Sequence, residues 1–218
     1  HTGTLFGGYE NKPIILGVIW LVFVIEMLLR FFPSRVESMG CRKQFAKNYI
    51  PTGKTQPLLQ SNRVTILIAL GWLAFNGIFG ALYLMKIMDK GMMVLLSLAF
   101  SVCDLICILF FCPFQTWFMK NKCCVSCRIY NWDYAMMFTP LLFIGGLFAW
   151  SLLAIAVALL LHWEYAVYKY PERFTENTND CLSCKNCPEK LCRHKKQLQK
   201  FLKKNRALLR SRGTKLWK

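Results

Sequence analysis

The chain has 218 residues, 55% of them apolar, and a formal net charge of +17. Its Lys and Arg residues collect in a few segments and leave long uncharged apolar stretches between them. Apolar runs of about 18 residues or more are typical of membrane-spanning helices, so this pattern argues against a soluble globular protein. No signal-peptide pattern is present in residues 1–12, and we expect the first apolar stretch to remain as a membrane helix.

Four apolar segments predict an all-α integral membrane protein, in which a bundle of four transmembrane helices forms a domain of residues 13–163. We expect these helices over residues 13–32, 64–85, 92–118 and 134–163. A short segment, 1–12, precedes this multi-pass domain, and a cysteine-rich basic tail, 164–218, follows it. Trp and Tyr fall mostly near the segment ends, where their amphipathic rings prefer the headgroup region of a bilayer.

Proline and glycine mark the expected boundaries and contacts of these helices. Pro13 suits the first position of a helix, and Pro33 ends the first segment. Small residues let helix backbones approach closely, so we expect a packing role for glycines in the second and fourth segments. These are Gly71, Gly77, Gly80, Gly145 and Gly146.

Lys and Arg mark the cytoplasmic side of membrane proteins, but here they divide between the two sides. Four crossings place the loops after the first and third helices on one side of the membrane and the tail on the other. The side of the loops has ten Lys and Arg residues, and the side of the tail has eighteen. When only Lys and Arg close to the helices are counted, the side of the loops has ten and the side of the tail has five. We expect both termini, and with them the tail, in the cytoplasm, because a polybasic tail suits the anionic inner leaflet.

The sharpest motif lies in the tail, where four cysteines have the spacing C-x2-C-x2-C-x4-C. They are Cys181, Cys184, Cys187 and Cys192. Three thiolates at two-residue spacing can surround one iron–sulfur cluster, as in the bacterial ferredoxin spacing, although the last interval is one residue longer here. We therefore predict a cluster, of the [4Fe–4S] type. Zinc stays open because four thiolates form a tetrahedral site, and disulfides stay open because four cysteines permit three pairings.

A second set of cysteines is expected on the side of the first and third loops. Its members are candidate ligands of another metal: Cys41, Cys123, Cys124 and Cys127. Adjacent cysteines beside a membrane are also common S-acylation targets, so the spacing alone does not decide. The cysteines of the third segment, Cys103, Cys107 and Cys112, are interpreted as small apolar residues that pack in the bundle.

Two acidic residues within the apolar segments are candidate catalytic residues. Asp104 lies near the middle of the third segment, where a carboxylate is costly and marks a proton carrier, a quinone contact or a partner for a cation. No basic residue lies deep in another apolar segment, so we expect Asp104 to have a polar neighbour such as Asn76. Glu26 precedes Arg30 by four residues, and the two can pair along one face of the first helix.

The end of the tail, residues 194–218, predicts a basic amphipathic helix, because apolar residues recur at helical spacing between Lys and Arg. Such a helix lies on a bilayer with anionic lipids. Nucleic acid is the less favoured partner, because aromatic residues are not interleaved with the basic ones.

Together these features predict a membrane-embedded electron-transfer protein, a candidate oxidoreductase component whose tail carries the iron–sulfur cluster. It would exchange electrons with a quinone or with a partner subunit, and we expect a protein partner or an oligomer. The first alternative is a non-enzymatic scaffold or assembly subunit with a zinc- or disulfide-stabilised tail. The second alternative, a small transporter, depends on Asp104 and the glycine-rich helices.

Overall fold

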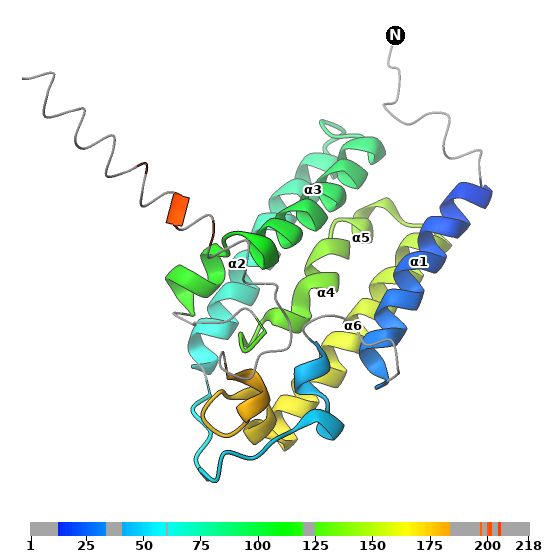
Figure 1. The fold of residues 1–218 in the computed structure, drawn as a ribbon. Helices are drawn as coiled ribbons and strands as arrows, with labels where there is room; N and C mark the ends of the chain where they lie inside the picture. Colours follow the sequence, from blue (N-terminus) through cyan, green and yellow to red (C-terminus); the bar gives the residue numbers. More distant parts are fainter. Residues whose placement is uncertain are drawn as a thin grey trace, which may run out of the picture.

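The computed structural model describes residues 13–33, 41–59, 61–119 and 125–183, with four further residues of the tail: Gln197, Lys200, Phe201 and Asn205. Within them, regular structure is helical apart from one isolated antiparallel bridge between Pro51 and Asn179. Four helices are long and apolar enough to cross a membrane, which confirms the predicted all-helical, multi-pass fold (Figure 1). They are α1 (Pro13–Phe31), α2 (Asn62–Leu84), α3 (Lys90–Leu109) and α6 (Leu147–Lys169).

The outward faces of these four helices are apolar, and most residues of each helix are not buried within the protein. Large exposed side chains recur along every one of them, among them Val18, Val22, Leu67, Leu70, Leu98, Val102, Val157 and Leu161. A continuous apolar surface of this extent is unfavourable in water and matches the hydrocarbon of a bilayer. The fold therefore places its polar contacts inside the bundle and at its ends.

The first and last long helices, α1 and α6, run parallel to each other. Trp20 Nε1 donates a hydrogen bond of 2.8 Å to Ser151 Oγ, a contact between residues 131 apart in sequence. Further along both helices the ring centroids of Phe31 and His162 lie 5.5 Å apart, at the same sequence separation. The end of α6 therefore lies at the end of the bundle where α1 also ends (Figure 1).

The segment predicted as one fourth helix, residues 134–163, is divided into three helices. They are α4 (Asp133–Phe138), α5 (Leu141–Ile144) and α6. The break between α5 and α6 falls at Gly145 and Gly146, whose φ angles are 73° and 93°. Residues with a Cβ rarely adopt positive φ, so these glycines permit a turn and do not serve the close helix packing expected of them.

The chain reverses direction at this glycine turn. Tyr134 contacts Glu26, and Phe138 packs 5.2 Å from Phe23, so α4 runs antiparallel to α1 before α6 returns parallel to it. The start of the tail therefore lies at the same end of the bundle as the loop that follows α1. The expectation that the tail lies opposite this loop, on the side where α1 begins, is wrong, and with it the expectation that both ends of the chain share a side, because residues 134–163 were treated as a single crossing.

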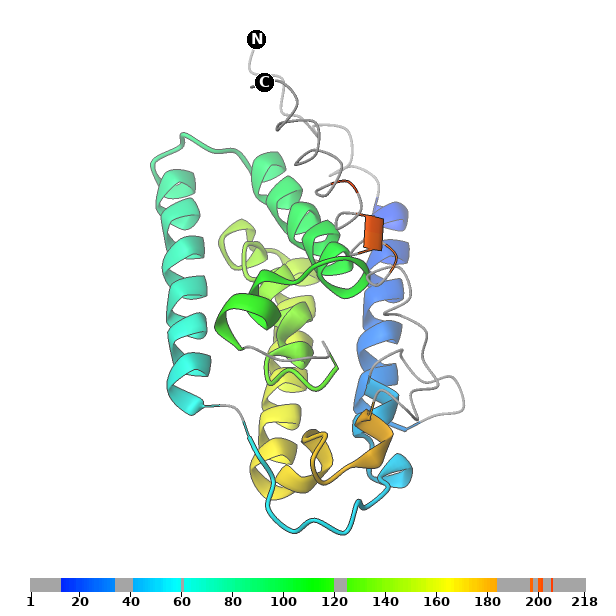
Figure 2. The same ribbon diagram turned by 60° about the vertical axis from the view of Figure 1, so that its left-hand side comes forward.

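Residues 170–183 pack directly on residues 41–59 at this end (Figure 2). Asp180 N donates to Ile50 O (2.8 Å), and Thr52 N donates to Thr178 O (3.2 Å). The short helix η1 (Cys41–Gln44) and the segment 125–132 complete the same region. We call residues 41–59, 125–132 and 170–183 the cysteine-bearing end, since Cys41, Cys127 and Cys181 lie in them.

Helix α3 packs on α2, α4 and α5, and α5 also packs on α6. The rings of Trp72 on α2 and Phe100 on α3 are 4.5 Å apart. A Cβ added to Gly80 would overlap the ring of Phe143 on α5, so the predicted close packing is confirmed at this glycine. A Cβ at Gly71 or Gly77 would meet no described atom within 4 Å.

The third long helix, α3, is shorter than the predicted segment of residues 92–118. It ends at Leu109, just before Cys112 and Pro113, and residues Phe114–Phe118 form a separate π-helical turn. Proline lacks a backbone N–H and clashes with the preceding turn, which accounts for the early end of the helix.

Candidate functional site

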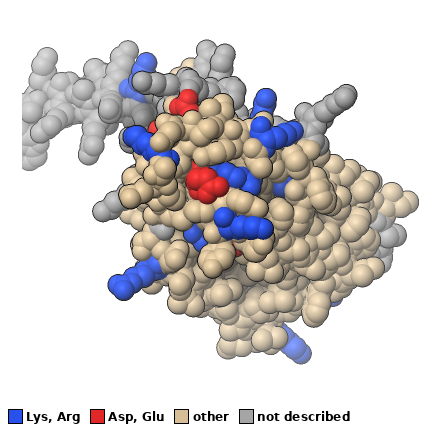
Figure 3. All heavy atoms as spheres, turned by 90° about the horizontal axis from the view of Figure 1, so that it is seen from below, with Lys and Arg blue, Asp and Glu red and all other residues tan. Residues whose placement is uncertain are grey.

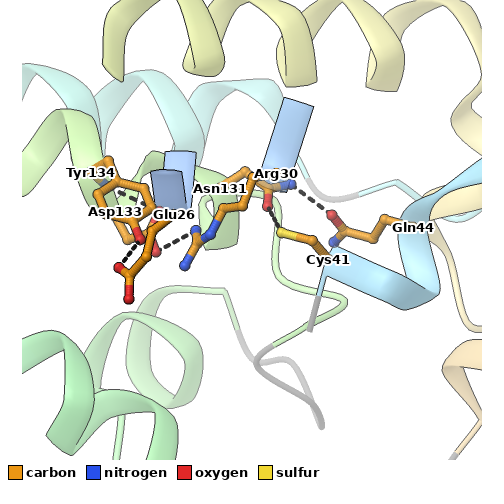
Figure 4. A network of polar contacts seen from close by, with 7 residues as sticks. All are labelled: Glu26, Arg30, Cys41, Gln44, Asn131, Asp133 and Tyr134. Atoms are coloured by element: carbon orange, nitrogen blue, oxygen red, sulfur yellow. Dashed lines mark hydrogen bonds and ion pairs between the residues drawn. The ribbon is translucent and has the colours of Figure 1, made fainter. Parts of the chain in front are cut away.

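Four consecutive residues, Asn131 to Tyr134, form the centre of a polar network between the bundle and the cysteine-bearing end, and Figure 4 shows the side chains of three of them, Asn131, Asp133 and Tyr134. They lie where the 3₁₀ turn η4 (Tyr130–Trp132) continues into α4. Asn131 contacts η1, Trp132 contacts α6, and Asp133 and Tyr134 contact α1. One short segment therefore connects three separate parts of the chain.

Arg30 and Asp133 form a buried ion pair at the centre of this network. The distance from Arg30 Nη1 to Asp133 Oδ2 is 2.5 Å, and the two side chains are 9% and 8% exposed. The Arg30 guanidinium also lies 4.5 Å from the ring centroid of Tyr134, a cation–π arrangement. Arg30 Nε has no acceptor among the described residues. A charge at this depth depends on such partners, because water does not compensate it.

Glu26 also takes its partner from α4. Tyr134 Oη donates a hydrogen bond of 2.7 Å to Glu26 Oε2. The expected pairing of Glu26 with Arg30 along α1 is replaced by these two contacts, in which each side chain bonds to a neighbouring residue of α4. The predicted candidate Glu26 is thus part of the network.

Asp104 lies on α3 within electrostatic range of Asp133, Arg30 and Cys112. The expectation that it has no cation within reach is therefore wrong, and Arg30 supplies one. Asn76, the neighbour we expected, instead donates to Trp72 O of its own helix (3.0 Å), and its Oδ1 has no donor among the described residues. Asp104 and Asp133 thus share Arg30 as a nearby cation, while Glu26 is held by Tyr134.

On the other side of Asn131, a chain of hydrogen bonds connects the first loop to the segment that carries Cys127. The Cys41 thiol, which is fully buried, donates to Asn131 Oδ1 (3.3 Å). Asn131 Nδ2 donates to Gln44 Oε1 (2.6 Å), and Gln44 Nε2 donates to the carbonyl of Val125 (2.5 Å). These bonds hold η1 against residues 125–131.

Asn179 connects the start of the tail to the same short helix. Its side chain is fully buried, donates to the carbonyls of Lys43 (3.2 Å) and Arg173 (2.8 Å), and accepts from Cys181 N (3.1 Å). The Arg173 guanidinium donates to Gln44 O at 2.6 and 3.1 Å. Burial lowers the pKa of Arg173, against the opposing effect of the Glu172 carboxylate.

The predicted metal ligands fall into two groups. Cys41 and Cys127 are buried and Cys181 is half-buried, all at the cysteine-bearing end. The other predicted ligands lie outside the described residues: Cys123, Cys124, Cys184, Cys187 and Cys192. Within the part of the chain that the structure describes, no group of three His, Cys, Asp or Glu side chains could hold a metal ion. The iron–sulfur and metal sites therefore stay predictions.

The predicted basic helix, residues 194–218, lies outside the described residues apart from the four named above. Cys103 is exposed and Cys107 is half-buried on α3, and Cys112, just after this helix, is half-buried.

A cavity of about 400 Å³ opens beside this network at the cysteine-bearing end. Its wall includes Asn131, Cys127 and Trp163. It also includes Arg128 and Glu164, which form a bidentate ion pair at 2.5 and 3.2 Å, and Trp132 Nε1 donates to the same carboxylate (2.9 Å). The indole Nε1 of Trp163 is buried and has no acceptor among the described residues.

Sequence reasoning identified Glu26 and Asp104 but missed Asn131, Asp133 and the cavity. The available signal was the Asn131–Tyr134 run itself, four polar or aromatic residues at the start of an apolar segment. Such residues are common at helix starts, so the run did not stand out. Comparisons with protein-family models, with curated proteins and with solved structures found no match.

Proposed function

We propose that this protein is a membrane redox protein that holds an iron–sulfur cluster at its cysteine-bearing end and exchanges electrons with a quinone or a protein partner. The observation that carries the proposal is the meeting of the three cysteine-containing segments at η1. Gln44 bonds to Val125, close to Cys127, and Asn179 bonds both to Lys43 and to Cys181. Cysteines far apart in sequence are thereby brought to one end of the bundle, as a shared site of metal ligands requires.

The cysteine-bearing end faces the cytoplasm in this proposal. Once the reversal at Gly145 and Gly146 is taken into account, the basic residues described between residues 13 and 183 no longer divide between the two ends. Nine lie in this end or in the helix ends next to it: Arg30, Arg42, Lys43, Lys47, Lys54, Arg63, Arg128, Lys169 and Arg173. At the other end are Lys86 and Lys90. Figure 3 looks onto the cysteine-bearing end and shows Lys and Arg spread around it. This asymmetry follows the positive-inside rule.

A cytoplasmic location favours metal ligation over disulfides, because cytosolic thiols are kept reduced. It also places the basic residues next to the anionic lipids of the inner leaflet, the lipid partner we propose. Reduction of a quinone to a quinol takes two electrons and two protons. The cluster would pass the electrons singly, and Glu26 and Asp104, inside the bundle, would be the proton carriers.

Metal and sulfide analysis of anaerobically purified protein tests the redox proposal. We expect iron and acid-labile sulfide, with visible absorption that is lost on reduction. Cys181→Ser, at a predicted ligand, should remove the absorption, whereas Cys103→Ser, on an exposed position of α3, should leave it unchanged. Zinc without sulfide, or paired cysteines, would contradict the proposal and support the non-enzymatic scaffold with a folded tail.

Labelling of lysines in the natural sequence tests the orientation. Lys54, Lys86 and Lys169 are all exposed, so each can react with an amine reagent that does not cross membranes. In inside-out vesicles we expect mass spectrometry to find Lys54 and Lys169 labelled and Lys86 protected, and the reverse in intact cells. Labelling of Lys54 and Lys169 from opposite sides would refute the arrangement of α6.

The carboxylates near Arg30 favour a second candidate, a small transporter that couples solute movement to protons. The reason is that Asp104, on a membrane helix, lies within electrostatic range of the Arg30–Asp133 pair, and a carboxylate in a membrane segment is costly and by default marks a functional site. Substrate-dependent flux in liposomes that is abolished by Asp104→Asn, in protein without iron, would favour this candidate over the redox proposal.

A further inference from the structure

One face of α6 changes in character along its length toward the cysteine-bearing end. Its exposed side chains are apolar as far as Leu161. Tyr165, one turn later, is 60% exposed, and the next turn carries Tyr168, 85% exposed, and the exposed Lys169. A helix rises about 1.5 Å per residue, so Tyr165 lies about 6 Å and Lys169 about 12 Å beyond Leu161. Apolar, then aromatic, then basic side chains are typical of the passage from the hydrocarbon of a bilayer to its headgroups.

The contact between α6 and α1 places this change at the membrane surface. The ring centroid of His162, next to Leu161, lies 5.5 Å from that of Phe31, the last residue of α1. Because α1 ends there, the residues of α6 after His162 extend beyond the hydrocarbon. The headgroup region on each side of a bilayer is about 5–8 Å thick, so Tyr165 lies within it. Lys169 reaches the same region with its long side chain.

Two tyrosine rings hold the ammonium group of Lys169. Its Nζ lies 5.7 Å from the ring centroid of Tyr165 and 5.4 Å from that of Tyr170. Such cation–π contacts orient the ammonium group but do not neutralise its charge. The ion pairs among the described residues are Arg30–Asp133 and Arg128–Glu164, so no described carboxylate pairs with Lys169. An exposed cation at the level of the headgroups attracts an anionic one.

An open apolar groove leads toward this cation from the membrane interior. It has a volume of about 460 Å³ and is lined by Leu142 of α5 and by α6 from Trp150 to Leu161. The small side chains of Ala154 and Ala158 form part of its wall and leave room beside the larger ones. From Trp150 to Leu161 the groove runs about 16 Å along the helix. The hydrocarbon of one bilayer leaflet is about 15 Å deep, so the groove has the length of an acyl chain in one leaflet.

We infer that this face of α6 binds one anionic phospholipid, whose acyl chain lies in the groove and whose phosphate pairs with Lys169. The groove and the cation are separate observations, and they follow each other along α6 in the order and at the spacing of the tail and head of one lipid. The exposed hydroxyl groups of Tyr165 and Tyr168 are donors for the phosphate oxygens. The inference rests on the proposed function for its lipid partner alone, to which it assigns one site, and it is independent of the cluster.

Native mass spectrometry of the delipidated full chain tests the headgroup contact, with dioleoylphosphatidylglycerol and dioleoylphosphatidylcholine as the probes. We expect one saturable phosphatidylglycerol per chain and weaker binding of phosphatidylcholine, which has no net charge. Lys169→Gln should weaken phosphatidylglycerol binding about fivefold, the effect of the roughly 1 kcal/mol that one cation contributes at an anionic surface. Lys54→Gln is the matched control, because it removes an exposed charge at the same end but outside the groove, and it should bind as the wild type does.

A second pair of variants tests the groove. Ala158→Leu fills it from an exposed position and should weaken the binding of both lipids. Ala74→Leu makes the same change at an exposed position of α2, outside the groove, and should have no effect. Circular dichroism checks that both variants are folded.

The outcomes separate this inference from the proposed function. If Lys54→Gln weakens binding as much as Lys169→Gln does, the attraction is spread over the whole end and the site is overturned. Equal binding of the two lipids would overturn the role of Lys169, and unchanged binding in Ala158→Leu would overturn that of the groove. Selective lipid binding by iron-free protein would support this site and contradict only the redox proposal.

Discussion

Replacement of either member of the Arg30–Asp133 pair should destabilise the bundle strongly. Both side chains are less than 10% exposed and their charged atoms lie 2.5 Å apart, so removal of one partner leaves a buried charge. This costs about 3–5 kcal/mol in buried pairs. Arg30→Met should lie at the upper end of this range, because Asp133 and Asp104 then both remain without their nearby cation. Asp133→Leu should lie at the lower end, because Asp104 still interacts with Arg30.

The measurement is the free energy of unfolding in mixed micelles, followed by circular dichroism. The double variant, Arg30→Met with Asp133→Leu, should cost less than the sum of the single variants by about 2 kcal/mol, because it leaves no unpaired member of the pair. Arg128→Met is the control at a more exposed pair, with side chains 14% and 25% exposed, and should lose on the order of 1 kcal/mol. The reasoning would be refuted if the double variant lost as much unfolding free energy as the two single variants together. It would also be refuted if each single variant at Arg30 or Asp133 lost less than about 1 kcal/mol.

Two further predictions concern packing and the start of the tail. Gly80→Ala should lower the unfolding free energy by about 1–3 kcal/mol, because the added methyl overlaps the Phe143 ring. Gly77→Ala, whose methyl meets no described atom within 4 Å, is the control, and equal losses in the two variants would contradict the packing. Asn179→Ala should lower the unfolding free energy by about 2–3 kcal/mol, since it removes three hydrogen bonds of a buried side chain, and should speed hydrogen exchange in residues 170–183. Unchanged exchange there would contradict the role of Asn179.

The four long helices could be predicted because a membrane requires about 20 apolar residues in succession, and the sequence has four such stretches. This requirement is local, so it can be met and recognised without knowledge of tertiary contacts. The early end of α3 follows from Pro113, which is also a local effect.

The direction of α6 could not be predicted in the same way. Hydropathy does not distinguish a glycine that packs against a neighbour from one that adopts a positive φ. Gly80 packs against a neighbour and Gly145 adopts a positive φ, although both lie in apolar stretches. Only the contacts of α4 and α6 with α1 show that the chain reverses at Gly145 and Gly146. The division of charge between the two sides was a consequence of this single missed turn.

The candidate site was predictable where a residue is unusual for its surroundings. Glu26 and Asp104 stand out because a carboxylate is rare within an apolar helix. Tyr134, which bonds to Glu26, and Asp133, which pairs with Arg30, lie at a helix start, where polar and aromatic residues are ordinary. The cavity depends on how four distant parts of the chain meet at Trp163, which no local pattern records.

The partners of α1 also bear on how the chain is assembled. Asp133 follows Arg30 by 103 residues and Tyr134 follows Glu26 by 108, so α1 enters the membrane long before either partner exists. At about 5–20 residues per second, translation leaves this interval at roughly 5 to 20 s. During it, the spacing of four residues lets Glu26 and Arg30 neutralise each other on α1. Exchange of this provisional pair for Tyr134 and Asp133 would then be a late step of folding, made when the ribosome has completed the second half of the bundle.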